Sequence, residues 1–126
     1  MNYLDLEKRD IMNYRNSPIS QVDIENHLLR LIDELEQETE AFEALAEDQA
    51  KKEAGYKSAW AKEYLSAKGS IKERESWADY KMADEHYYHK MAEALLKSKR
   101  EKLQSLRTAI DAMRTLNANV RVQVGP

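Results

Sequence analysis

The stretch Tyr64-Leu65-Ser66-Ala67-Lys68-Gly69-Ser70-Ile71-Lys72-Glu73 decides the fold, because it has the pattern of a corner between two long helices. Gly69 is one of three glycines in the chain, and it stands where a helix end needs a residue that tolerates positive φ. Ser70 is suited to cap the next helix, and Glu73 three residues later completes a capping-box pattern. One helix therefore ends and another begins within a few residues, which predicts an antiparallel helical hairpin.

Outward from this corner, apolar residues recur at helical spacing on both sides. Residues 20–67 are predicted to form one long helix, although Gly55 leaves open whether it is broken, and residues 70–117 form a long return helix. Residues 3–15 predict a short helix that ends before Pro18, and residues 118–126 a flexible tail. The fold class is all-α and coiled-coil-like.

The return helix carries a heptad seam that is interrupted by four polar residues, Glu75, Glu85, His89 and Lys99. The seam consists of Ile71, Ala78, Met82, Ala92, Leu96, Leu103, Leu106, Ile110 and Met113. Two thin helices bury limited apolar surface, so a hairpin of this length leaves seams exposed. The sequence therefore predicts a homo-oligomer, joined through the C-terminal part of the seam: Leu96, Leu103, Leu106, Ile110 and Met113.

Composition narrows the class of protein. A length of 126 residues corresponds to one domain, and the absence of cysteine excludes disulfides and thiolate metal sites. No apolar core of a signal peptide stands at the N-terminus, and no apolar run reaches the roughly 20 residues that a membrane span needs. Phosphate-binding loops and nucleophile motifs are missing. These features predict a cytoplasmic protein that is not an enzyme and has no cofactor.

Charge is divided unevenly along the chain. Residues 1–54 hold 6 Lys and Arg against 14 Asp and Glu, whereas residues 55–126 hold 14 against 9. A polyanion would therefore meet the second half of the chain, where aromatic and basic residues interleave around the corner. Single-stranded nucleic acid needs rings on which bases stack and cations that follow the phosphates. The predicted phosphate contacts are Lys57, Lys62, Lys68, Lys72 and Arg74, with Tyr56 and Tyr64 for stacking.

Each of these features has a plainer alternative. The aromatic residues Trp60, Tyr64 and Trp77 are also typical of the core of a hairpin tip. A second basic surface, predicted at Lys97, Arg100 and Lys102, has the composition of a solvated helix face. The acidic face of the first long helix either solubilises the chain or binds a basic partner; it consists of Asp33, Glu36, Glu40, Glu43 and Glu47. His86 and His89 lie one helical turn apart but match no metal motif.

Five short segments resemble phage recombination mediator proteins of the UvsY type. They are Tyr64-Leu65-Ser66-Ala67-Lys68-Gly69, Glu73-Arg74-Glu75, Leu95-Leu96-Lys97, Arg100-Glu101-Lys102-Leu103 and Ile110-Asp111-Ala112-Met113-Arg114. The resemblance spans roughly Ala59 to Ile110. It implies a protein that binds single-stranded DNA, forms a ring-like oligomer, and loads a recombinase onto strands coated by single-strand-binding protein. The family places basic residues just before the corner tyrosine, in a stretch that here holds Lys57 and Lys62.

Two functions therefore remain open on the sequence. The first is a single-stranded-DNA-binding accessory protein of phage recombination or replication. The second is a phage-encoded helical interaction module or inhibitor, whose acidic face binds a host nucleic-acid-binding protein. A purely structural coiled-coil adaptor, which only self-assembles, is a third.

Overall fold

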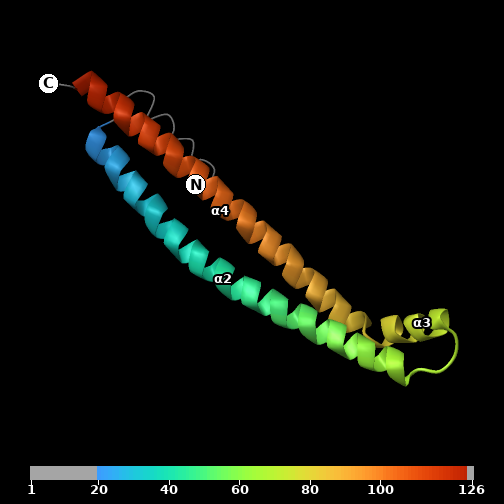
Figure 1. Ribbon diagram of the computed structural model, residues 1–126. Helices are drawn as coiled ribbons and strands as arrows, with labels where there is room; N and C mark the ends of the chain where they lie inside the picture. The colour runs from blue at the N-terminus through green and yellow to red at the C-terminus, as the bar shows by residue number, and fades with distance from the viewer. Residues whose placement is uncertain (1–19, 125–126) are drawn as a thin grey trace, which may run out of the picture. The chain divides into compact units, whose positions relative to one another are not determined.

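A computed structural model describes residues 20–124, so the helix predicted at residues 3–15 lies outside the described part. The helices are α2 (Gln21–Ser66), α3 (Ile71–Lys81) and α4 (Ala83–Val124), as drawn in Figure 1. No strand occurs within residues 20–124, and α4 packs back against α2. The predicted all-α helical hairpin is confirmed.

Helix α2 follows the predicted bounds closely and passes Gly55 without a break. At its start, the Ser20 hydroxyl accepts a hydrogen bond from the backbone N–H of Asp23 at 3.1 Å. Gly55 lies on an exposed part of the helix, and a Cβ added there would meet no atom within 4 Å. A glycine in an exposed helix costs only about 1 kcal/mol relative to alanine, which the rest of this long helix absorbs.

The corner, by which we mean residues 60–81, has the expected local chemistry. Gly69 is the one residue with positive φ within the described chain, at 113°. Ser70 caps α3, because its hydroxyl oxygen accepts from the backbone N–H of Glu73 at 3.2 Å. The Glu73 carboxylate in turn accepts from the Ser70 hydroxyl at 3.3 Å. Helix-capping residues thus turn the chain, as the sequence predicts.

Substitution by alanine is expected to have opposite effects on stability at Gly69 and at Gly55. Gly69→Ala should lower the free energy of unfolding by about 1–2 kcal/mol, because an L-residue is strained at positive φ and its Cβ would overlap the Glu73 carboxylate. Gly55→Ala should raise it by about 0.5–1 kcal/mol, because nothing obstructs the added Cβ. Urea denaturation followed by circular dichroism measures both. Equal effects at the two positions would contradict this account of the corner.

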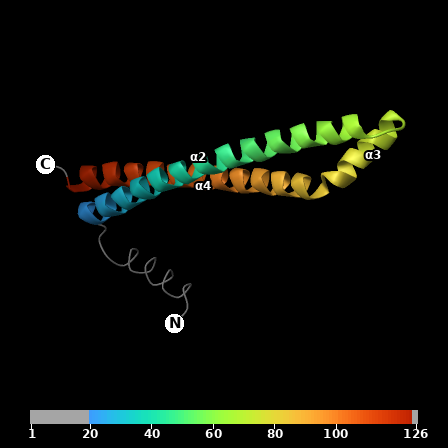
Figure 2. The same ribbon diagram turned by 90° about the horizontal axis from the view of Figure 1, so that it is seen from below.

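The return arm, by which we mean α3 and α4 together, was predicted to be one helix but consists of two. Helix α3 ends at Lys81 and α4 begins at Ala83, with Met82 at φ −102° and ψ 18° between them. Figure 2 shows that α3 and α4 run in different directions. Two contacts hold α3 on α2: Trp60 Nε1 donates to Asp79 at 2.9 Å, and Trp77 Nε1 donates to Glu63 at 3.1 Å. The single helix predicted over 70–117 was therefore wrong, since tertiary contacts fix the direction of α3.

The described residues belong to two compact units, residues 20–35 with 106–124, and residues 36–105. In the first unit the core consists of Ile24, Leu106, Ile110 and Val120, with Ile24 only 2% exposed. Asn117 is also buried there. The flexible tail predicted from residue 118 was wrong as far as Val124, because α4 continues and Val120 is buried. Burial outweighs the weak helix propensity of the β-branched residues.

In the second unit the buried seam of the return arm includes polar residues. Ala78, Ala92 and Leu103 are buried, and so is His89 at 5% exposure. The side chain of Lys99 is 24% exposed, so His89 and Lys99 continue the seam that they were predicted to interrupt. Ile71 was predicted to belong to the seam but is 68% exposed. Glu75 and Glu85, which were also predicted to interrupt the seam, are exposed and do interrupt it.

Candidate nucleic-acid interface

The corner holds four exposed lysines, and three of them, Lys62, Lys68 and Lys72, are predicted phosphate contacts. Trp60 and Trp77 each donate to a carboxylate of the opposite helix, and Trp60 also stacks on Tyr64 at 5.5 Å between ring centroids. Around this scaffold Lys62, Lys68 and Lys72 are exposed. None of the three forms an ion pair with any residue between 20 and 124. They are the predicted phosphate contacts that the structure leaves accessible.

The other two predicted phosphate contacts are engaged elsewhere. Lys57 Nζ lies 2.9 Å from the Glu53 carboxylate. Arg74 is half-buried, and its Nε is buried without a hydrogen-bond partner among the described atoms. Arg74 lies one turn before the fully buried Ala78 on α3, which makes it less accessible than the three lysines, and its phosphate contact stays a prediction.

The predicted stacking residues pack within the chain. Tyr56 stacks on His89 at 5.7 Å between ring centroids and lies 5.2 Å from the ring of His86. Tyr64 stacks on Trp60. Both tyrosines are half-buried, so the plainer reading, aromatic packing at the hairpin tip, holds for Trp60 and Tyr64. The exposed rings are others: Trp77, Tyr80, Tyr87 and Tyr88.

The exposed tyrosines of the return arm, Tyr80, Tyr87 and Tyr88, were given no role from the sequence. The spacing on α4 indicated a shared face, because Tyr88 and the exposed Leu95 are seven residues apart and fall outside the buried seam. Residues seven apart share one face of a helix. The heptad spacing could therefore have predicted a second helix face, distinct from the buried one.

The second predicted basic surface divides into free and engaged cations. Lys97 is exposed, whereas Arg100 lies over the ring of Phe42, 5.7 Å from its centroid. Lys99 and Lys102 both pair with Glu38 of α2, Lys102 at 3.2 Å. The structure therefore assigns Lys102 to an ion-pair network between helices, which leaves Lys97 as the most accessible of the three predicted residues.

The same network lowers the pKa of Glu38 below its ordinary value. The largest cause is the hydrogen bond from Lys99, followed by that from Lys102, since both favour the ionised carboxylate. The Glu38 side chain is 16% exposed. The paired charges therefore help to fix how α2 and α4 are aligned along each other in this unit.

Acidification should weaken the Glu38 network. Because the pKa of Glu38 is lowered in the folded state, its contribution to stability is present above the unfolded value of about 4.3 and is lost as the pH falls through the folded value. The difference in free energy of unfolding between the wild type and Glu38→Gln should therefore be largest near neutral pH and shrink in acid. Urea denaturation at several pH values measures it. A difference that is independent of pH would contradict the network.

The predicted assembly residues fill the core of the chain itself. Leu103, Leu106 and Ile110 are buried, and Leu96 and Met113 are half-buried. In this packing they are not open to a second subunit. Their predicted role in joining subunits is therefore not supported, because the hairpin already covers them.

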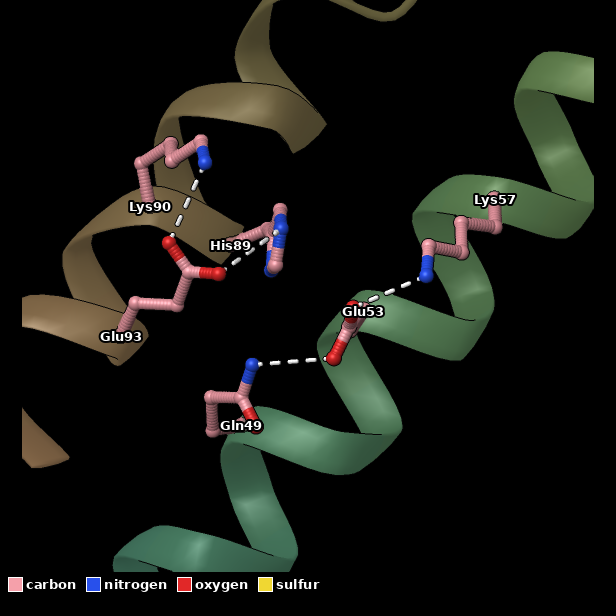
Figure 3. Close-up of polar contacts among 6 residues, drawn as sticks. All are labelled: Gln49, Glu53, Lys57, His89, Lys90 and Glu93. Carbon is pink, nitrogen blue, oxygen red and sulfur yellow. Dashed lines mark hydrogen bonds and ion pairs between the residues drawn. The ribbon is translucent and has the colours of Figure 1, made fainter.

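His89 lies in a polar layer between α2 and α4 (Figure 3). Its Nε2 is 3.6 Å from a Glu93 oxygen, and its Nδ1 is buried without a partner among the described atoms. Across the layer, Glu53 accepts from Gln49 at 3.1 Å and pairs with Lys57, which is the main cause of its lowered pKa. No group of three metal-ligating side chains occurs within residues 20–124.

The predicted acidic face is exposed along α2. Asp33 belongs to the first unit, and Glu36, Glu40, Glu43 and Glu47 belong to the second. Glu47 pairs with Lys51 at 2.9 Å. Like charges at intervals of three and four residues repel slightly on a helix, so this face lowers helix stability and favours solubility.

None of the described helices has a segment that is both long and apolar enough to span a bilayer. Comparison of the chain with protein-family models, with curated proteins and with solved structures finds no match. Function must therefore be inferred from the surfaces themselves.

Proposed function

We propose that this chain is a non-enzymatic accessory protein that binds single-stranded DNA at the corner. The observation that carries the proposal is the set of exposed, unpaired cations Lys62, Lys68 and Lys72 on a scaffold held by two tryptophan hydrogen bonds. Free cations release the counterions of a phosphate backbone when they bind it, whereas cations already paired to carboxylates contribute less. Lys97 adds a further exposed cation on α4.

The finer part of the proposal comes from the resemblance to phage recombination mediators. By that resemblance the protein acts on recombination or replication intermediates, forms a homo-oligomer, and helps a recombinase to displace single-strand-binding protein. These partners are proposed together with DNA binding. They would place the protein in the cytoplasm of the host cell.

Fluorescence anisotropy with a labelled oligo(dT) strand tests the core of the proposal. Micromolar protein should raise the anisotropy at 50 mM salt, where counterion release favours binding most, and the signal should fall as salt is added. Double-stranded DNA of the same length is the matched control and should bind more weakly. Absence of salt-sensitive binding to the single strand would refute the proposed function.

The acidic face favours one alternative, a protein that occupies the nucleic-acid site of a basic host partner. Glu36, Glu40 and Glu43 are exposed on α2 and carry the observation. Affinity purification from host lysate after nuclease treatment distinguishes the two functions. One stoichiometric partner that is lost in a Glu36→Lys, Glu40→Lys, Glu43→Lys variant would favour the alternative.

A further inference from the structure

The return arm carries a second face at heptad spacing that the chain does not bury. Its large side chains are all at least 43% exposed, and they form what we call the aromatic stripe: Trp77, Tyr80, Tyr87, Tyr88, Met91 and Leu95. All six belong to the same compact unit. Soluble proteins rarely leave so many large apolar side chains exposed on one face without a binding partner.

The geometry of the stripe follows from helix periodicity. On α4, Tyr88 and Leu95 are one heptad apart and Tyr87 and Met91 are four residues apart, which places the four on one face of that helix. Trp77 and Tyr80 are three residues apart on α3. The buried seam at Ala78, His89 and Ala92 lies on another side of the same arm. The stripe therefore has two parts, one on α3 and one on α4, that meet at the break at Met82 within the same compact unit.

Cations border the stripe along its length. Lys81 Nζ lies 4.9 Å from the centre of the Trp77 ring. Lys90 and Lys97, one heptad apart, follow the stripe on α4, and both are exposed. Lys90 also pairs with Glu93 at 3.2 Å, so Lys97 is the more available of the two. Asp84 is the carboxylate that falls within it, between Trp77 and Met91 in the heptad register.

We propose that the aromatic stripe is the platform on which the bases of a single strand stack, with Lys81, Lys90 and Lys97 facing its phosphates. The inference rests on the proposed function and deepens it, because it moves the stacking contacts from Tyr56 and Tyr64 to the return arm. Rings accept any base through their π-faces, and bordering cations supply the charge complementarity.

Two tryptophan variants give the stripe its own spectroscopic readout. Trp60→Phe leaves Trp77 as the sole tryptophan and preserves a ring against Tyr64, and Trp77→Phe leaves Trp60. Addition of oligo(dT) should quench the emission of Trp77, because a base stacks on it, and leave that of the packed Trp60 nearly unchanged. Circular dichroism confirms that both variants are folded.

Alanine variants measure the contribution of the stripe to affinity. Tyr80→Ala and Tyr88→Ala should each weaken binding about fivefold or more, since a stacked base contributes roughly 1–3 kcal/mol. Asp84→Asn should strengthen binding, because it removes a charge of the same sign as the phosphates. Leu29→Ala, at an exposed apolar residue of the other unit, is the control and should leave affinity unchanged.

The outcomes separate the stripe from the proposed function. Salt-sensitive binding without Trp77 quenching, and with normal affinity in the tyrosine variants, would overturn the stripe and leave the function standing. Absence of binding would overturn both. Tyrosine variants that convert an oligomer to monomers at unchanged DNA affinity would assign the stripe to contacts between copies of the chain and overturn the inference.

Discussion

Reversal of two lysines at the corner is expected to weaken binding of single-stranded DNA by about tenfold or more at 50 mM salt. The variant carries Lys68→Glu and Lys72→Glu. Both side chains are exposed and unpaired within residues 20–124, so each change removes a phosphate contact and adds repulsion. Anisotropy with labelled oligo(dT) measures the loss, and sedimentation should show an unchanged oligomeric state.

A charge-matched variant separates local contact from net charge. Lys51→Glu with Lys52→Glu changes the net charge by the same amount, but these lysines already pair with Glu47 and Asp48 at 2.9 Å. The control should retain most of the wild-type affinity. Equal losses in the two variants would mean that only overall charge matters, and the corner would not be the binding site.

Truncation of the core should have the largest effect on stability. Ile110→Ala is expected to lower the free energy of unfolding by about 2–5 kcal/mol, because Ile110 is 4% exposed and little around it can close the cavity. Leu29→Ala is the control, at an exposed apolar side chain of the same unit, and should change stability by less than about 0.5 kcal/mol. Urea denaturation measures both.

The same variant also tests where the C-terminal seam packs. If Ile110 fills the core of its own chain, stability falls at every protein concentration. If it instead joined subunits, Ile110→Ala would dissociate an oligomer, and its effect on stability would depend on protein concentration. The second result would restore the interface that the sequence predicted and contradict the packing described here.

The corner was predictable because its determinants are local. Gly69 and Ser70 act on their own backbone, and no distant residue is needed to turn the chain there. The break at Met82 was not predictable, since neither proline nor glycine marks it and the contacts that direct α3 come from Trp60 and Glu63 of α2. Local signals specify where helices end only when the cause is local.

The sequence predicted the exposed lysines of the candidate site better than it predicted which aromatic side chains are exposed. Lys62, Lys68 and Lys72 are exposed as expected, because lysine rarely loses its hydration without a partner. Tyr56 and Tyr64 were assigned to stacking, but each packs on an aromatic neighbour of its own chain. A tyrosine suits both a core edge and a surface, so its role depends on helix pairing, which composition does not give.

His89 and Lys99 show the same limit in the core. As single residues they were predicted to interrupt the seam, yet each occupies a heptad position and faces inward. Lys99 is compensated by Glu38 of α2, a residue 61 positions away. For these two residues heptad position outweighs residue type, whereas Glu75 and Glu85 are exposed and interrupt the seam as predicted.

The salt dependence of binding tests the central claim most directly. If Lys62, Lys68 and Lys72 contact three phosphates, they should contribute about −2 to the slope of the logarithm of the binding constant for oligo(dT) against the logarithm of salt concentration, and the Lys68→Glu, Lys72→Glu variant should make the slope shallower by about 1.4. A wild-type slope near zero, or a slope that the variant leaves unchanged, would contradict DNA binding at the corner.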